Sequence, residues 1–281
     1  MATNRSCVWS VASIAALALV LNGCGDGPSY KREEAAETIR TICANEYYLT
    51  VSARELGETV AVHLHQAGLL QQVGGQIGLM PDAHELLGNL IEVIHRVLLS
   101  CDRPPGFYIV LLSDPTVPGA YVSMVRYLDD VRLVNANSIA PMEFFSRTVF
   151  ELKFIAPQPI TLETLPIHDL TLAQFLSSQL AQRIQNRLID RVHEEGLSTV
   201  MVGQCEGVFD RGEFAFTVNV TPMVSTQLDE HVLQTAFEEA TSVVAQVLSS
   251  YHFDGFEAVR LIHPATGRNL LLPKGRLEPF R

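Results

Sequence analysis

Basic residues are scarce in this chain. Its 281 residues include 20 lysines and arginines against 31 aspartates and glutamates, which gives a formal net charge of −11. A protein that neutralises phosphates needs clustered Lys and Arg, and the only such cluster lies in the tail, at Arg268, Lys274, Arg276 and Arg281. The composition therefore argues against nucleic acid or an anionic lipid surface as the main partner.

Familiar catalytic motifs are also missing. The sequence contains no glycine-rich phosphate loop, no HExxH zinc motif and no SxxK motif. The segment Gly203-Gln204-Cys205-Glu206-Gly207 has the spacing of a nucleophile elbow with Cys in place of Ser, but it leads towards a strand, whereas an elbow turns into a helix. We therefore predict no catalytic residue and interpret Cys205 as a thiol in a hairpin turn.

The amino terminus has the pattern that is typical of a secretory signal. The basic segment Asn4-Arg5-Ser6 precedes an uncharged run from Cys7 to Leu21, which is shorter than the ~20 apolar residues that span a bilayer as a helix. The sequence Leu21-Asn22-Gly23-Cys24 then resembles the lipobox of bacterial lipoproteins. This resemblance implies that the signal peptide, residues 1–23, is cleaved and that the thiol of Cys24 carries the lipid.

The lipobox also implies a location in the cell. Residues 24–30 would form a short lipidated tether, so the membrane would be contacted through the lipid on Cys24. In Gram-negative lipoproteins an Asp directly after the lipidated Cys favours the inner membrane, whereas this chain has Gly25 there. The resemblance thus implies the periplasmic face of the outer membrane in a Gram-negative envelope.

Few cysteines remain for disulfides in the exported part. The chain has five, of which Cys7 lies in the signal and Cys24 is the lipid site, leaving Cys43, Cys101 and Cys205. Cys43 ends the first expected helix and Cys101 follows the second. If these helices are antiparallel, the two thiols lie at opposite ends of the layer, so we predict no disulfide.

Hydrophobic periodicity predicts the elements of residues 31–156. We expect a helix over 31–44, a hairpin around Gly57, a long loop from Gln66 to Met80, a helix over 83–100, and strands over 107–112 and 120–127. A short helix follows at 128–137. Residues 137–156 fit either a helix after Pro141 or a strand from Thr148, and the pattern does not separate the two.

The remainder of the chain repeats this order. After a Pro-rich linker at 157–170, the capping box Thr171-x-x-Gln174 starts a long helix. A hairpin of 198–204 with 213–220, a helix over 227–249, and strands over 256–262 and 269–272 complete residues 171–281. Residues 106–115 and 255–264 also share Gly, Phe, Val and Pro in register.

The matching order predicts an α+β fold of two related modules, residues 31–156 and 171–281. Each module would read helix, hairpin, helix, strand, strand, with a small and largely antiparallel sheet covered on one face by helices. An ancient duplication explains this order, and chance recurrence of strand and turn chemistry is the alternative.

Three groups of side chains are weak candidates for chemistry. His63 and His65 share one face of an expected strand and could ligate zinc, but two solvated histidines on an open sheet face is the simpler interpretation, so we predict no metal or other cofactor. His84, Glu85 and His95 are near only in sequence. The pairs Asp129-Asp130 and Glu238-Glu239 are interpreted as solvated charge.

These observations favour a non-enzymatic envelope lipoprotein that binds another protein or builds part of an envelope assembly. The alternative is a periplasmic binder of a small molecule, lipid or metal, which would use the loop from Gln66 to Met80 and the open sheet faces. An enzyme of unrecognised type is the third possibility.

Overall fold

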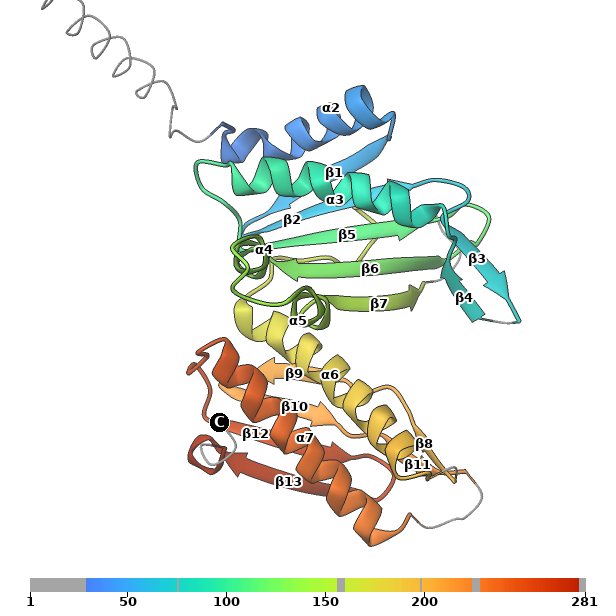
Figure 1. Ribbon diagram of the computed structural model, residues 1–281, viewed down its shortest axis with the longest axis vertical. Helices are drawn as coiled ribbons and strands as arrows, with labels where there is room; N and C mark the ends of the chain where they lie inside the picture. Colours follow the sequence, from blue (N-terminus) through green and yellow to red (C-terminus); the bar gives the residue numbers. More distant parts are fainter. Residues whose placement is uncertain (1–28, 75, 156–159, 198, 224–227, 278–281) are drawn as a thin grey trace, which may run out of the picture.

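The computed structural model describes residues 29–74, 76–155, 160–197, 199–223 and 228–277 (Figure 1). The fold is α+β, as the sequence predicts, and it contains two sheets of four or more strands, each covered on one face by a pair of helices. The predicted signal segment, residues 1–23, and Cys24 lie outside the described residues.

The first module contains a five-stranded sheet of order β1-β2-β5-β6-β7 under helices α2 and α3. Its elements are η1 (Arg32–Glu34), α2 (Ala35–Tyr47), β1 (Val51–Leu56), β2 (Thr59–His65), β3 (Leu70–Val73), β4 (Gln76–Leu79), α3 (Ala83–Leu99), β5 (Phe107–Ser113), β6 (Ala120–Tyr127), α4 (Leu128–Asn135), α5 (Pro141–Ser146) and β7 (Val149–Phe154).

The second module contains a four-stranded sheet of order β13-β12-β10-β9 under helices α6 and α7. Its elements are α6 (Leu172–Glu194), β8 (Val200–Val202), β9 (Gly207–Asp210), β10 (Glu213–Thr217), β11 (Val220–Pro222), α7 (Glu230–Ser250), β12 (Ala258–His263), β13 (Arg268–Pro273) and η2 (Lys274–Arg276).

The two sheets share one topology. In each, a hairpin (β1-β2 or β9-β10) lies beside a second hairpin (β5-β6 or β12-β13), and the two are joined by the only parallel pair of the sheet. Thr59 pairs with Phe107 at the same point where Glu213 pairs with Ala258. Phe107 is therefore equivalent to Ala258 in the sheet. The sequence match of residues 106–115 with 255–264 instead aligns Phe107 with Phe256, two residues away, so the topology is repeated but this sequence match does not follow it.

Local sequence explains the most regular elements. The side chain of Thr171 accepts a hydrogen bond from the backbone of Gln174, whose own side chain accepts from the backbone of Thr171, so the expected capping box starts α6. Every residue of β5 is buried, which fits its continuous apolar run. Arg211 and Gly212, both with positive φ, form the two-residue turn between β9 and β10.

Residues 137–156 contain both elements that the sequence left open. Pro141 begins the short helix α5, and β7 follows it as the outer strand of the first sheet. The two interpretations were therefore successive and not exclusive.

The prediction of a loop from Gln66 to Met80 is wrong, because strands β3 and β4 in this segment pair as a hairpin. The buried carboxylate of Asp114 holds the start of this hairpin by accepting hydrogen bonds from the N–H groups of Leu69 and Leu70, at 2.8 and 3.0 Å. Burial alone raises the pKa of Asp114, but these bonds and those from Thr116 lower it overall.

The described part of the predicted linker, residues 160–170, packs against the first sheet. We call this segment the strap. Ile160, Leu162 and Leu165 are buried against the face of the first sheet that the helices leave free. Thr59 in β2 donates a hydrogen bond to Asp169 at 3.0 Å. The expected open face of the first sheet is therefore closed.

The predicted hairpin of the second module pairs the wrong segments. Glu213–Thr217 pairs with β9, while the short strand β8 pairs with β11 in a separate two-stranded ribbon. Among the described residues of the expected partner, 198–204, the strand covers 200–202.

Helices α2 and α3 are antiparallel, as the argument about the cysteines requires (Figure 1). Ser29, just before the first helix, donates its N–H to the carbonyl of Ser100 at the end of α3, and Tyr30 forms a bridge with Cys101. Cys43 lies at the other end of α2. Both thiols, and that of Cys205, are free and buried, and burial raises the pKa of Cys43 to about 11.

Candidate functional site

The outer edge of β7 carries unpaired backbone groups. The N–H of Phe150 donates to the side chain of Gln182 in α6, which shows that it points away from β6. The N–H of Ile155, five residues on, donates to the carbonyl of Gly119 on the β6 side. Strand geometry then directs the polar backbone groups of Leu152 and Phe154 to the free edge as well. No described residue supplies a hydrogen bond to either N–H, so this edge can accept another strand.

Gln182 of α6 occupies the beginning of this edge. Its Oε1 accepts from the N–H of Phe150 at 2.9 Å, and its Nε2 donates to the carbonyl of Thr148 at 3.3 Å. The side-chain amide thus provides the acceptor and the donor that a neighbouring strand would provide. The edge is satisfied up to Phe150 and open from there on.

The edge strand of the second sheet, β9, lines the same cavity as β7 and α6. Just before β9 the carbonyl of Glu206 accepts from the N–H of Thr217, so Gly207 and Phe209 direct their backbone groups away from β10. Gly207 lies tight against the helix, since a Cβ atom there would come within 2.2 Å of the carbonyl oxygen of Ser177. The close packing fixes the distance between β9 and α6.

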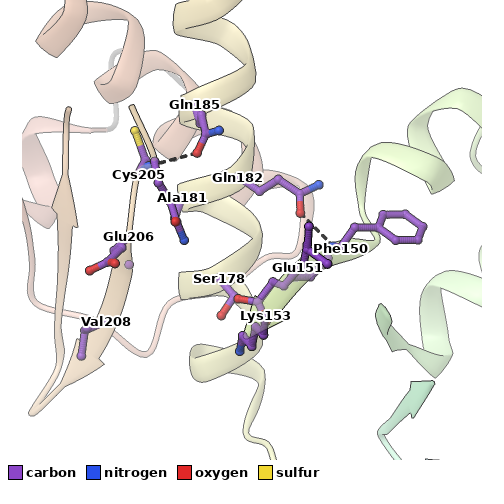
Figure 2. Close-up of a pocket in the computed structure, with 14 residues that line it drawn as sticks. Phe150, Glu151, Lys153, Ser178, Ala181, Gln182, Gln185, Cys205, Glu206 and Val208 are labelled. Carbon is purple, nitrogen blue, oxygen red and sulfur yellow. Dashed lines mark hydrogen bonds and ion pairs between the residues drawn. The ribbon is translucent and has the colours of Figure 1, made fainter. Parts of the chain in front are cut away.

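A cavity of about 540 Å³ lies between these walls (Figure 2). A second cavity of about 270 Å³ adjoins it on the strap side and shares six lining residues with it. We call the two together the slot; the residues common to both cavities are Val149, Glu151, Lys153, Ser178, Gly207 and Val208.

Apolar side chains flank the slot on the helix side of the first sheet. Phe154 and Leu152 in β7 are 65% and 41% exposed, and Phe145 and Met142 in α5 are 59% and 78% exposed. The ring of Phe145 packs on that of Phe150, with centroids 5.5 Å apart, so the two elements form one row. A contiguous exposed apolar row beside an open strand edge is typical of a protein-binding surface.

Charged side chains flank the slot on the strap side. Glu151 and Lys153 form an ion pair at 2.7 Å on the face of β7 opposite the apolar row. Glu206 on the other wall is exposed, and no described cation lies within ion-pair distance of it. The two faces of β7 therefore offer different chemistry to a neighbouring strand.

A buried polar network fixes the two modules on either side of the slot. The carboxylate of Asp130 accepts from the guanidinium of Arg147 at 2.8 Å and from the hydroxyl of Tyr251 at 2.6 Å. Gln179 of α6 donates to the carbonyl of Arg147 and to the hydroxyl of Tyr251. Burial raises the pKa of Asp130, although the bonds from Tyr251 and Arg147 oppose this.

Among the predicted candidates, His63 and His65 lie together but are not a solvated pair. His63 is buried, and both rings bond to the hydroxyl of Ser113, each at 2.7 Å. Burial, with a smaller effect of His65, lowers the pKa of His63 to about 4. The expectation of two solvated imidazoles is wrong for His63, because the strap covers this side of the sheet.

The other metal-ligating candidates lie elsewhere. His95 bonds to the hydroxyl of Tyr108 at 2.7 Å under the helices, while His84 and Glu85 are exposed at the start of α3. Within the described ranges no group of three or more His, Cys, Asp and Glu side chains is placed to hold a metal ion.

Cys205 lines the slot, but its thiol is buried and its N–H donates to Gln185 at 3.0 Å (Figure 2). Burial raises the pKa of Cys205, which disfavours the thiolate that a nucleophile requires. The chain enters β9 after Glu206, so the expected lead into a strand is confirmed. The placement of Cys205 in a hairpin turn is wrong, because it lies between β8 and β9, which belong to different sheets.

The carboxylate pairs are not simply solvated. Asp129 bonds to Tyr127 and pairs with Arg132, but Asp130 is buried in the network described above. Glu238 bonds to Gln234 at an exposed position, whereas Glu239 pairs with Arg187 at 2.8 Å. The prediction of solvated charge is wrong for Asp130, since α4 directs it towards Arg147 and Tyr251 of neighbouring elements.

Sequence reasoning missed the slot. The alternation Phe150, Leu152, Phe154 is a strand signal, yet its neighbours in space come from α6 and β9, more than twenty residues away in sequence. Nothing in a single sequence places those two edges opposite one another.

No family model matches this chain, and no curated protein matches it. Of the helices in the described part, none is both long and apolar enough to cross a membrane.

Proposed function

We propose that this chain is a lipid-anchored cell-envelope protein that binds an extended segment of a partner protein in the slot. The single observation that supports this most strongly is the free edge of β7 beyond Gln182, next to an exposed apolar row. An added strand would satisfy the edge amides of Leu152 and Phe154 and cover part of that row. The role is binding and not catalysis.

The slot suits a chain segment better than a compact ligand. The free edges of β7 and β9 supply backbone hydrogen-bonding groups in a row, which is what an extended chain requires. The alternative, a binder of a small molecule, lipid or metal, is expected to use the loop from Gln66 to Met80 and the open sheet faces. The structure supports it less well, because β3 and β4 form a hairpin held by Asp114 and the strap covers the free face of the first sheet.

Photo-crosslinking in cells tests this binding site. A photoreactive residue at Leu152 should crosslink one discrete partner, while the same residue at Leu271, an equally exposed leucine on the edge strand β13, should not. Adding Phe154→Pro should abolish the product, because it removes an N–H that faces the slot but leaves the β6 ladder intact. Phe154→Ala is the matched control.

Two outcomes contradict strand addition. One is a crosslinked product of undiminished yield in the Phe154→Pro variant, since the partner would then not use that amide. The other is an equal yield at Leu271, which would show unspecific capture by any exposed edge. Circular dichroism and the melting midpoint of each variant establish that the sheet itself survives.

The anchor is tested separately at Cys24. Cys24→Ala should abolish labelling by a fatty-acid analogue and leave the precursor unprocessed by the lipoprotein signal peptidase. A Ser6→Ala variant, altered in the same segment outside the lipobox, should be labelled normally. Labelling that persists without the Cys24 thiol would refute the lipid anchor and leave the slot proposal untouched.

A further inference from the structure

Residues Phe150 to Phe154 of β7 would match a second, antiparallel copy of the same sequence in both apolar and charged positions. Residues Phe150 to Phe154 read Phe-Glu-Leu-Lys-Phe. In an antiparallel alignment centred on Leu152, Phe meets Phe, Leu meets Leu, and Glu meets Lys on both sides. This inference rests on the proposed strand addition and concerns the chemistry of the added strand.

The hydrogen-bonding pattern agrees with this alignment. Phe150, Leu152 and Phe154 direct their backbone groups to the free edge, so Leu152 and Phe154 would each form a hydrogen-bonded pair with the residue opposite, while Phe150 would offer its carbonyl alone. An antiparallel strand centred on Leu152 therefore uses the open groups, and only the N–H of Phe150 is already taken by Gln182.

The two faces of such a strand would meet different surroundings. Residues opposite Phe150, Leu152 and Phe154 would extend the exposed apolar row. Residues opposite Glu151 and Lys153 would enter the part of the slot that these two charges line, and Glu206 lines the larger of its two cavities from the β9 side. A cation opposite Glu151 and a carboxylate opposite Lys153 would be attracted, and the reverse arrangement would be repelled.

We propose that the slot takes an antiparallel segment of the pattern apolar, acidic, apolar, basic, apolar, read from its amino terminus. Charge complementarity with Glu151 and Lys153 sets its direction and register. The acidic residue of the segment lies opposite Lys153 and the basic residue opposite Glu151.

A second copy of this chain matches the pattern but does not fit the slot. Its β7 would bring β6 along, about 5 Å further from the edge. The space there holds α6 and β9, which line the same cavity as β7. The occupant is therefore a segment of a partner that is free of its own sheet on at least one side.

Three blocked hexapeptides test the inference with the full chain purified in detergent. Their sequences are Val-Phe-Glu-Leu-Lys-Phe, its charge-swapped form Val-Phe-Lys-Leu-Glu-Phe, and the neutral Val-Phe-Gln-Leu-Gln-Phe, each acetylated and amidated to remove end charges. Fluorescence anisotropy should rank them in the order matched, neutral, swapped. We expect at least about a fivefold difference in Kd between matched and swapped peptides, from two cross-strand charge pairs that change sign.

A protein variant provides the reciprocal control. Glu151→Lys with Lys153→Glu keeps the composition and net charge of β7 while it exchanges the two charges. The preference should reverse, so that the swapped peptide binds at least about fivefold more tightly than the matched one. The neutral peptide should bind both proteins equally.

Each of the other results would contradict a particular part of the proposal. A preference for the swapped peptide by the unaltered chain would mean a parallel strand, and equal binding of all three would mean that charge does not select; both leave strand addition standing. Binding of none, with no Leu152 crosslink, would refute the proposed function itself. Concentration-dependent dimers that Phe154→Pro abolishes would make a second copy the occupant.

Discussion

Arg147 carries a charge whose removal should destabilise the protein far more than that of an exposed arginine. Its side chain is 7% exposed and that of its partner Asp130 is 3% exposed, with 2.8 Å between the paired atoms. The substitution Arg147→Met keeps most of the volume but leaves the Asp130 carboxylate buried without its cation. Breaking a buried pair from one side costs about 3–5 kcal/mol.

Two comparisons sharpen this expectation. Arg132→Met is the matched control, because Arg132 pairs with Asp129 at the surface and should cost less than about 1 kcal/mol. Asp130→Asn should cost less than Arg147→Met, about 1–3 kcal/mol, since Arg147 keeps its bond to Glu143 at 2.9 Å.

The pH dependence gives an independent check. Burial raises the pKa of Asp130 in the folded state, so the folded chain holds this proton more tightly than the unfolded chain. A group of this kind makes the protein relatively more stable as the pH falls towards its unfolded pKa. Without Arg147 the pKa of Asp130 should rise further, and the deficit of the variant should shrink between pH 7 and pH 5.

Urea unfolding at both pH values measures these free energies, with an unchanged slope as the sign that the folded state is comparable. Equal losses in Arg147→Met and Arg132→Met would refute the reasoning. So would a deficit of Arg147→Met that grows as the pH falls, because protonation would then not relieve the buried carboxylate.

Three further predictions concern the rest of the molecule. Asp114→Asn should destabilise the protein by about 1–3 kcal/mol at pH 7; because the folded pKa of Asp114 is lowered, the loss should fade as the pH drops below about 4, and a constant loss in urea unfolding would contradict this. Non-reducing peptide mapping should show no link between Cys43 and Cys101, and a linked peptide would refute the antiparallel helices. A fragment of residues 161–281 should melt cooperatively, but at a lower temperature than the whole chain because it lacks Asp130; an insoluble or molten fragment would show that the modules do not fold separately.

The elements that the sequence predicts well are those whose burial is decided locally. In α6 a capping box and a helical stripe agree, and β5 is a short apolar run between turn residues. The β3-β4 hairpin escapes prediction because its strands are rich in Gln and Gly, so that period two is weak and the signal lies in the distant carboxylate of Asp114. Composition misleads in the strap, where prolines suggest a linker but Leu162 and Leu165 are buried on a sheet.

The candidate site depends almost wholly on tertiary placement. The apolar and charged faces of β7 can be read from the order of its residues, yet its free edge becomes a slot only because α6 and β9 face it. The buried state of Asp130 likewise depends on Tyr251, more than a hundred residues away in sequence.

The position of Gln182 and β9 has a consequence for stoichiometry. A strand that reads Phe-Glu-Leu-Lys-Phe on an open edge has the composition of segments that polymerise by stacking one chain on the next. Here Gln182 of α6 closes the edge at Phe150, and β9 of the second sheet lines the same cavity as β7, so an added segment would have a wall behind it and would offer no free edge to a second segment. The free edge of β7 can therefore bind one added strand and no more, and we expect a complex with one partner segment per chain.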